Sequence, residues 1–141
     1  MRSTFIFTAL LAATAFALPT LEVRGNAAVN PNAITGLKCT NKATKIGDHN
    51  INVALLSICG GIAGAIENCR GTPQSTVGAS GDAKFTLTAA TKGQTINISK
   101  GRWEGCVRAA RAVCGDSPFT TTCIGGANGN KGNVNVALAK A

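Results

Sequence analysis

Apolar and polar positions follow two different periods along this chain, and the longest regular stretch has the period of a helix. From Asn50 onward, apolar residues recur every three or four positions as far as Cys69, which is the spacing of one helix face. Asp48 or Asn50 is available as the N-terminal cap and Gly71 as the stop. This pattern predicts a long helix with a strongly buried stripe, formed by Ile51, Leu55, Ile58, Ile62, Ile66 and Cys69.

A second stretch with the helical period follows Ser99, whose side chain can cap the helix, and ends at Gly115. Glu104 precedes Arg108 by four residues, a spacing that allows an ion pair on the outer face of a helix. The inner stripe is expected to consist of Trp103, Cys106, Val107, Ala110, Val113 and Cys114.

Alternation with a period of two predicts strands elsewhere. Residues 85–89 and 95–99 alternate on either side of Thr91-Lys92-Gly93, which predicts an antiparallel hairpin. Residues 71–82 are rich in Gly, Ser, Thr and Pro and are expected to form a loop. Three further strands are expected at Ile34–Thr40, Phe119–Ile124 and Asn133–Leu138. Together these elements predict an α+β fold, βαββαβ with an extra C-terminal strand, in which two helices pack on one face of a small antiparallel sheet.

The cysteine count adds cross-links to this picture. The chain has six cysteines and one histidine, and an even number of cysteines favours three disulfides. Ten residues of helix span about 15 Å, more than the about 7 Å that separates bridged Cα atoms, so neither helix is expected to close on itself through Cys59–Cys69 or Cys106–Cys114. The cysteines expected to pair are Cys39, Cys59, Cys69, Cys106, Cys114 and Cys123.

Few large side chains are available for the core. Outside the first 17 residues, the only large aromatic residues are Phe85, Trp103 and Phe119. Disulfides, which typically contribute about 2 to 4 kcal/mol each, are therefore expected to supply a large part of the stability. Because the chain has no Cys-x-x-Cys pair and His49 has no second histidine beside it, neither a metal nor another cofactor is expected.

The N-terminus has the layout of a cleaved secretory signal. An early Arg2, an apolar run and the small-residue tripeptide Ala15-Phe16-Ala17 predict a signal peptide over residues 1–17. A disordered lead-in or propeptide is expected over 18–33, with a processing site at Leu21-Glu22-Val23-Arg24, followed by a single disulfide-stabilised domain over 34–141. The protein is thus expected to be secreted and extracellular.

The charge suggests a binding surface. The net charge is +8, which promotes attraction to anionic surfaces such as membranes or cell-wall polymers. The candidate contact surface is the basic row of the second predicted helix, Lys100, Arg102, Arg108 and Arg111. Asn97-Ile98-Ser99 is an N-glycosylation sequon whose Asn is expected on the outer face.

These features carry a resemblance. The signal, the Leu21–Arg24 site, two cysteines in each predicted helix with one near each end, and the βαββαβ order resemble the small cysteine-rich effectors of plant-associated fungi. They are most similar to the effectors that share the α/β-sandwich of the killer toxins of smut fungi. The resemblance spans Leu37 to Leu138 and implies a secreted, non-enzymatic protein that acts on a host or a competing microbe.

Two functions follow from this reading. No catalytic constellation is recognisable around Glu67, Glu104 or His49, so an enzyme is not expected. The favoured hypothesis is an effector that binds a host protein or glycan in the extracellular space, the apoplast of a plant host, without a specific nucleic-acid partner. The alternative is a cationic antimicrobial or antifungal protein that acts on membranes or cell walls.

Overall fold

The computed structural model describes residues 29–62, 69, 73–128 and 131–141. The expected signal peptide, the Leu21–Arg24 site, Ile66, Glu67 and the helix stop at Gly71 lie outside the described residues. The end of the expected lead-in is described and contains a short 3-10 helix, η2 (Pro31–Ala33), which begins where the Asn30 side chain accepts a hydrogen bond from the backbone N–H of Asn32.

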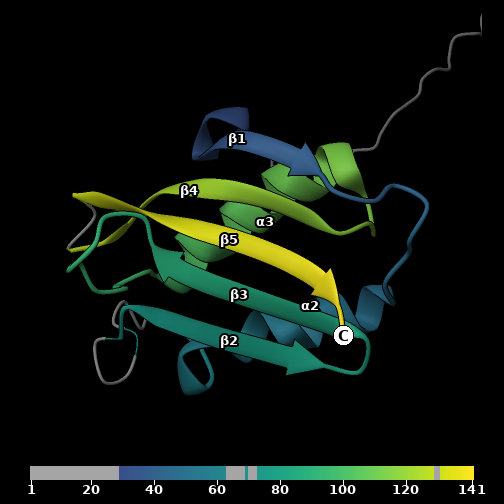
Figure 1. The fold of residues 1–141 in the computed structure, drawn as a ribbon, viewed down its shortest axis with the longest axis horizontal. Helices are drawn as coiled ribbons and strands as arrows, with labels where there is room; N and C mark the ends of the chain where they lie inside the picture. Colours follow the sequence, from purple (N-terminus) through teal and green to yellow (C-terminus); the bar gives the residue numbers. More distant parts are fainter. Residues whose placement is uncertain (1–28, 63–68, 70–72, 129–130) are drawn as a thin grey trace, which may run out of the picture.

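Five antiparallel strands form one sheet in the order β1-β4-β5-β3-β2 (Figure 1). The central strands β5 and β4 are the two longest, and each buries every second side chain over most of its length. The five strands are β1 (Ile34–Cys39), β2 (Ser75–Ser80), β3 (Ala83–Ala89), β4 (Phe119–Ala127) and β5 (Gly132–Lys140).

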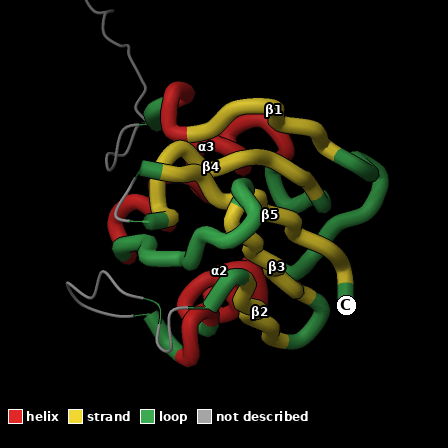
Figure 2. The backbone as a smooth tube through the Cα atoms, turned by 60° about the vertical axis from the view of Figure 1, so that its left-hand side comes forward, coloured by secondary structure: helices red, strands yellow, loops and turns green. Residues whose placement is uncertain are grey.

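Two helices cover one face of this sheet and lie behind it in Figure 1. Helix α2 (Asp48–Leu56) packs on β2 and β3, and helix α3 (Lys100–Cys114) packs on β1 and β4 (Figure 2). Trp103 is fully buried between the layers, where its indole N–H donates to the backbone oxygen of Leu55 at 2.8 Å and its ring meets Phe85 edge to face. The predicted α+β class, with two helices on one face of an antiparallel sheet and three disulfides, is confirmed.

The first helix is much shorter than predicted. It begins after Gly47, which caps it without a side-chain bond, and it ends at Leu56. A separate 3-10 turn, η3 (Ile58–Gly60), follows, in which Cys59 has a left-handed φ of 57°. The apolar period wrongly predicted a longer helix because Ile58 and Ile62 are buried at helical spacing without belonging to the α-helix.

The end of this helix explains an error in the predicted cysteine pairing. Cys59 and Cys69 form a disulfide with their Cα atoms 4.7 Å apart, although a continuous helix would hold them about 15 Å apart. Because the chain leaves the helix before Cys59, the two residues can approach each other. The other exclusion was sound, since Cys106 and Cys114 pair with different partners.

The predicted hairpin was also wrong. Strand β3 pairs with β2 on one side and with β5 on the other, and β2 lies within the segment that was expected to be a loop. Residues 95–99 contribute only an isolated bridge between Ile96 and Ala127. An added Cβ on Gly78 of β2 would lie 2.4 Å from a backbone oxygen of α2. Gly78, which contributed to the prediction of a loop, therefore allows the helix to pack closely against the edge strand.

The second helix follows the prediction closely. Ser99 caps it by accepting a hydrogen bond from the backbone N–H of Arg102, and Gly115 ends it. Val113 is the one member of the predicted inner stripe that is exposed, at 63%. Glu104 pairs with Lys100 at 2.9 Å, where the sequence predicted Arg108.

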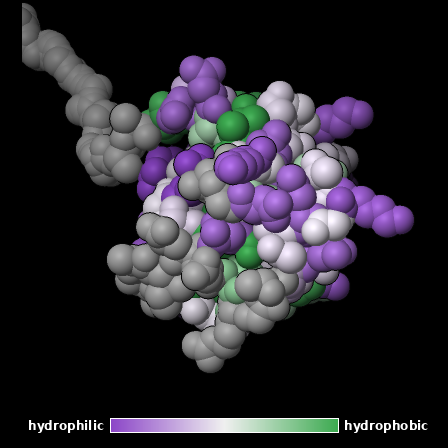
Figure 3. All heavy atoms as spheres, turned by 90° about the vertical axis from the view of Figure 1, so that its left-hand side faces the viewer, coloured by the Kyte–Doolittle hydropathy of each residue, from purple (hydrophilic) through white to green (hydrophobic). Residues whose placement is uncertain are grey.

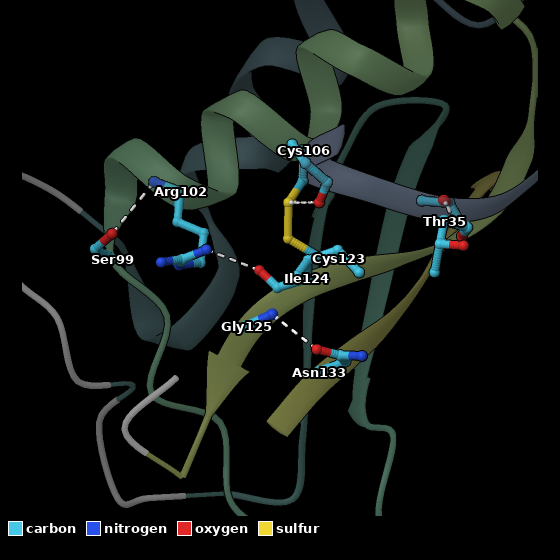
Figure 4. The surroundings of a disulfide bond; sticks show 10 residues. Thr35, Ser99, Arg102, Cys106, Cys123, Ile124, Gly125 and Asn133 are labelled. Carbon is cyan, nitrogen blue, oxygen red and sulfur yellow. Dashed lines mark hydrogen bonds between the residues drawn. A yellow bond between two sulfur atoms is a disulfide. The ribbon is translucent and has the colours of Figure 1, made fainter. Parts of the chain in front are cut away.

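Two disulfides attach helix α3 to the sheet. Cys39–Cys114 joins the end of β1 to the end of the helix, and Cys106–Cys123 joins the middle of the helix to β4 (Figure 4). Three disulfides in a chain of this size are typical of secreted or extracellular proteins. None of the helices in the described ranges is long and apolar enough to cross a membrane.

Candidate functional site

The predicted basic row does not form one uniform surface, because most of its charges are engaged within the protein. Lys100 donates to Glu104 one helical turn away. Arg111 bridges Asp48 at 2.7 Å and also contacts Asp116, so it ties the start of α2 to the end of α3. Arg108 forms no ion pair with any part of the chain that the structure describes.

Arg102 is held in position on the side of α3 that faces β4. Its guanidinium donates to the backbone oxygen of Ile124 at 2.8 Å, close to the Cys106–Cys123 disulfide (Figure 4). An added Cβ on Gly125, which has a φ of +79°, would lie 2.9 Å from the Arg102 guanidinium. The glycine therefore makes room for the arginine, which lies against the backbone of β4 and keeps its remaining N–H donors for other contacts.

A hollow of about 440 Å³, here called the arginine cleft, lies at the start of α3. Both Arg102 and Arg108 line it, and none of the described residues in its wall is acidic. Asn30 and Asn32 contribute amide groups to the wall, and Gly101 and Gly105 of the helix add no side chain that would fill the hollow. The wall consists of Asn30, Asn32, Ala33, Ser99, Gly101, Arg102, Gly105, Arg108 and Ile124.

A second cleft, of about 410 Å³, separates α2 from α3, and Arg108 lies between the two hollows. Its charges are mixed, because three carboxylates and two arginines face it over the apolar side chains of Leu55 and Val107. Each of the three carboxylates is already in an ion pair, Asp48 and Asp116 with Arg111 and Glu104 with Lys100. Among the residues that the structure describes, this cleft therefore has no unpaired carboxylate for acid or base chemistry and no excess of positive charge.

The remaining residues considered for chemistry are dispersed. His49 is exposed on α2, apart from the arginine cleft. Within residues 29–62, 69, 73–128 and 131–141, no three His, Cys, Asp or Glu side chains come together in a way that could hold a metal ion.

The sequon residue Asn97 is half-buried and lies between two buried isoleucines. Its backbone N–H donates to the oxygen of Gly126 at 2.7 Å, and its side-chain oxygen is buried. The sequon's Ser99 is the cap of α3, with its hydroxyl accepting from the Arg102 backbone. The sequon thus lies where the bridge to β4 meets the start of the helix.

Sequence reasoning missed Asn30 and Asn32 as part of the cleft wall. The only signal in the sequence was the Asn-Pro-Asn tripeptide, which is typical of a turn or helix start, and nothing in it indicated that this turn would lie beside α3.

Figure 3 shows the end of the molecule that forms the left-hand side of Figure 1, where hydrophilic side chains dominate the coloured surface.

No family model, no curated protein and no solved structure matches this chain. The fold and the cleft define the protein as a small α+β domain stabilised by three disulfides, with a hollow at the start of its longer helix whose described wall residues are basic or neutral.

Proposed function

We propose that this protein is a secreted, cysteine-rich, non-enzymatic effector that binds an anionic group of an extracellular host target in the arginine cleft. Three disulfides support the extracellular setting, because such bonds persist in oxidising compartments. The likeness to killer-toxin-like effectors of plant-associated fungi rests on the order of strands and helices and on the two cysteines of helix α3, and it supports the assignment to virulence in the plant apoplast.

The observation that carries the proposal is the pairing of two arginines in a hollow whose described wall residues include no carboxylate. Guanidinium groups present N–H donors in a planar fork that matches carboxylate, phosphate and sulfate oxygens. The fork of Arg102 is held against β4 by its bond to Ile124, so less side-chain freedom is lost when a ligand binds. The asparagine side chains of Asn30 and Asn32 supply further donors beside these charges.

Arg108 offers the cleaner test, because it has no ion pair within the described chain, whereas Arg102 also contacts the sheet. Oxidised protein would be immobilised and exposed to host apoplastic fluid, and the bound partner quantified for wild type and Arg108→Glu. We expect Arg108→Glu to lower partner capture and the host response by at least about tenfold, since a charge-assisted hydrogen bond contributes about 1.5 to 3 kcal/mol.

The matched control is Lys92→Glu, which makes the same charge change at an exposed lysine outside the cleft. We expect it to bind as wild type does, with both variants folded by circular dichroism. Equal capture by wild type and Arg108→Glu would contradict the proposal.

The alternative function is a cationic antimicrobial or antifungal protein that acts on membranes or cell walls. It is favoured by a net charge of +8 and by the exposure of scattered lysines, namely Lys38, Lys42, Lys45, Lys84, Lys92 and Lys131. At physiological salt the Debye length is about 8 Å, so attraction by such scattered charges is strongly screened. Growth inhibition of bacteria or rival fungi that persists at physiological salt and is unchanged by Arg108→Glu would support this alternative over the effector.

A further inference from the structure

The face of the sheet opposite the helices is open, and its central rows are rich in polar side chains, with Val77 exposed at the β2 edge. Figure 1 looks onto this face, and both helices lie behind it. Along β3, Thr86 is half-buried and Thr88 is exposed while their neighbours point into the core. On β4, Thr120 is exposed and Thr122 is half-buried in the same alternation.

The registers of the strands align five polar side chains into one row, which we call the polar ladder. Thr35 lies opposite Thr122, which lies opposite Asn135, and the row continues through Asn135–Thr88 and Thr88–Ser75. All five strands contribute one member. Because neighbouring strands lie about 4.8 Å apart, the ladder extends about 19 Å across the sheet.

Beside the ladder the face is hollowed. Thr120 and Thr86 flank Ala137 in the next row, and Gly36 lies at the wall on the β1 side. These small residues leave a shallow depression of about 300 Å³ whose wall is mostly threonine side chains. Hydroxyl groups both donate and accept hydrogen bonds, so such a wall can match a partner that is itself covered with hydroxyls.

The charge on this face has one sign. None of the five strands contains an aspartate or a glutamate. Two exposed lysines lie on the open face, Lys38 opposite Thr120 and Lys84 opposite Ala139. The hydroxyl-lined depression thus lies in a region that attracts anions.

We propose that this open face binds an extended acidic polysaccharide, with sugar hydroxyls on the polar ladder and sugar carboxylates at Lys38 and Lys84. A neutral glycan fits less well, because protein sites for neutral sugars rely on exposed aromatic rings, and Phe85, Trp103 and Phe119 are all fully buried. The face lies on the opposite side of the sheet from the helix that carries the arginine cleft, and none of the cleft residues lines its depression. This inference therefore stands apart from the proposed function.

The test uses the full oxidised protein and measures the Kd for de-esterified polygalacturonate by isothermal titration. Fully methyl-esterified polygalacturonate has the same backbone and hydroxyls without the charge, and a single-stranded oligonucleotide supplies charge without the sugar-acid pattern. We expect binding to the de-esterified polymer, at least about tenfold weaker binding to the esterified one, and weaker binding to the oligonucleotide.

Two variants locate the site. Thr88→Val/Thr122→Val removes two ladder hydroxyls while keeping the branched shape that strands favour, and we expect a Kd about tenfold or more higher, since each hydrogen bond contributes about 1 kcal/mol. Lys38→Gln/Lys84→Gln is expected to weaken binding and reduce its salt dependence. The control Lys92→Gln/Lys131→Gln makes the same charge change at exposed lysines that lie outside the five strands and is expected to leave the Kd within about twofold.

The proposal is overturned if the control weakens binding as much as Lys38→Gln/Lys84→Gln, because net charge alone would then explain the affinity. It is also overturned if the threonine variant binds like wild type or if the oligonucleotide binds as tightly as the polysaccharide. Arg108→Glu separates the two proposals, because it is expected to lower target capture by at least about tenfold and to leave the polygalacturonate Kd unchanged.

Discussion

Removing the Cys39–Cys114 disulfide is expected to destabilise the protein more than removing Cys59–Cys69. The first bond closes a loop of sequence separation 75 and the second a loop of separation 10. In the chain-entropy model, cross-links of these lengths restrict the unfolded chain by about 4.5 and about 2.7 kcal/mol respectively. The double variant Cys39→Ala/Cys114→Ala should thus lose about 1.8 kcal/mol more than Cys59→Ala/Cys69→Ala.

Cys59 and Cys69 are both buried, at 9% and 1% exposure, whereas Cys114 is 4% exposed and Cys39 is half-buried. Loss of packing is therefore no greater in Cys39→Ala/Cys114→Ala, and a larger loss of stability in that variant reports the loop. The assay is urea unfolding followed by circular dichroism, with free energies from linear extrapolation. If Cys59→Ala/Cys69→Ala lost as much stability as the other variant or more, restriction of the unfolded chain would not be the main effect of these bonds.

Three further predictions concern packing and charge. Gly78→Ala should lower the free energy of unfolding by about 1 to 3 kcal/mol, because the added Cβ would meet the backbone of α2. The control Gly105→Ala, whose Cβ meets nothing within 4 Å, should raise it by up to about 1 kcal/mol, because alanine is the better helix former. Equal effects of the two variants in urea unfolding would refute this prediction. Trp103→Phe leaves a buried carbonyl without its donor and should cost about 1 to 3 kcal/mol, and an unchanged urea midpoint would contradict the contact. Hydrogen bonding by the Asn50 amide, together with the backbone N–H of Gly47, lowers the pKa of Asp82 below its ordinary value of 3.8. The ionised carboxylate therefore stabilises the fold above about pH 4, and this contribution is lost as the pH falls through the folded pKa. Asp82→Asn should therefore flatten the fall of the urea midpoint between about pH 5 and about pH 2, and an unchanged slope would count against it.

The sequence was most informative where a signal was local and repeated. Helix α3 has an apolar stripe together with a serine cap and a glycine stop, and all three signals agree on the same boundaries, Ser99 and Gly115. Helix α2 has the same apolar period, but nothing in that period marks the end at Leu56. The end is fixed by Cys59 in a left-handed conformation and by a disulfide to Cys69, and a hydrophobic period contains no information on either.

Strand pairing was less accessible, because neither composition nor alternation identifies the partner of a strand. Ser75–Ser80 is polar and contains a glycine, so it reads as a loop, yet it pairs along its whole length with β3. Residues 95–99 alternate as a strand does, but only Ile96 finds a bridge. Alternation indicates which side chains are buried, but it does not indicate which strand pairs with which.

The candidate site was predictable in part. The basic residues of α3 were identified from the sequence, but their partners were not, because Asp48 and Asp116 come from other elements. The arginine cleft depends on the turn at Asn30 and Asn32 and on the backbone of β4, which only the folded chain brings to the helix. The polar ladder depends on the register of five strands and was likewise invisible.

Mapping the disulfides of the secreted protein by mass spectrometry tests the account most directly, because both proposed surfaces depend on this stapled architecture. Trypsin leaves Cys59 and Cys69 in one peptide, and additional cleavage at Asp116 separates Cys114 from Cys123. The account predicts an internal bond in the first peptide and the cross-linked pairs Cys39–Cys114 and Cys106–Cys123. Free thiols, or a cross-link from Cys59 or Cys69 to any other cysteine, would contradict it.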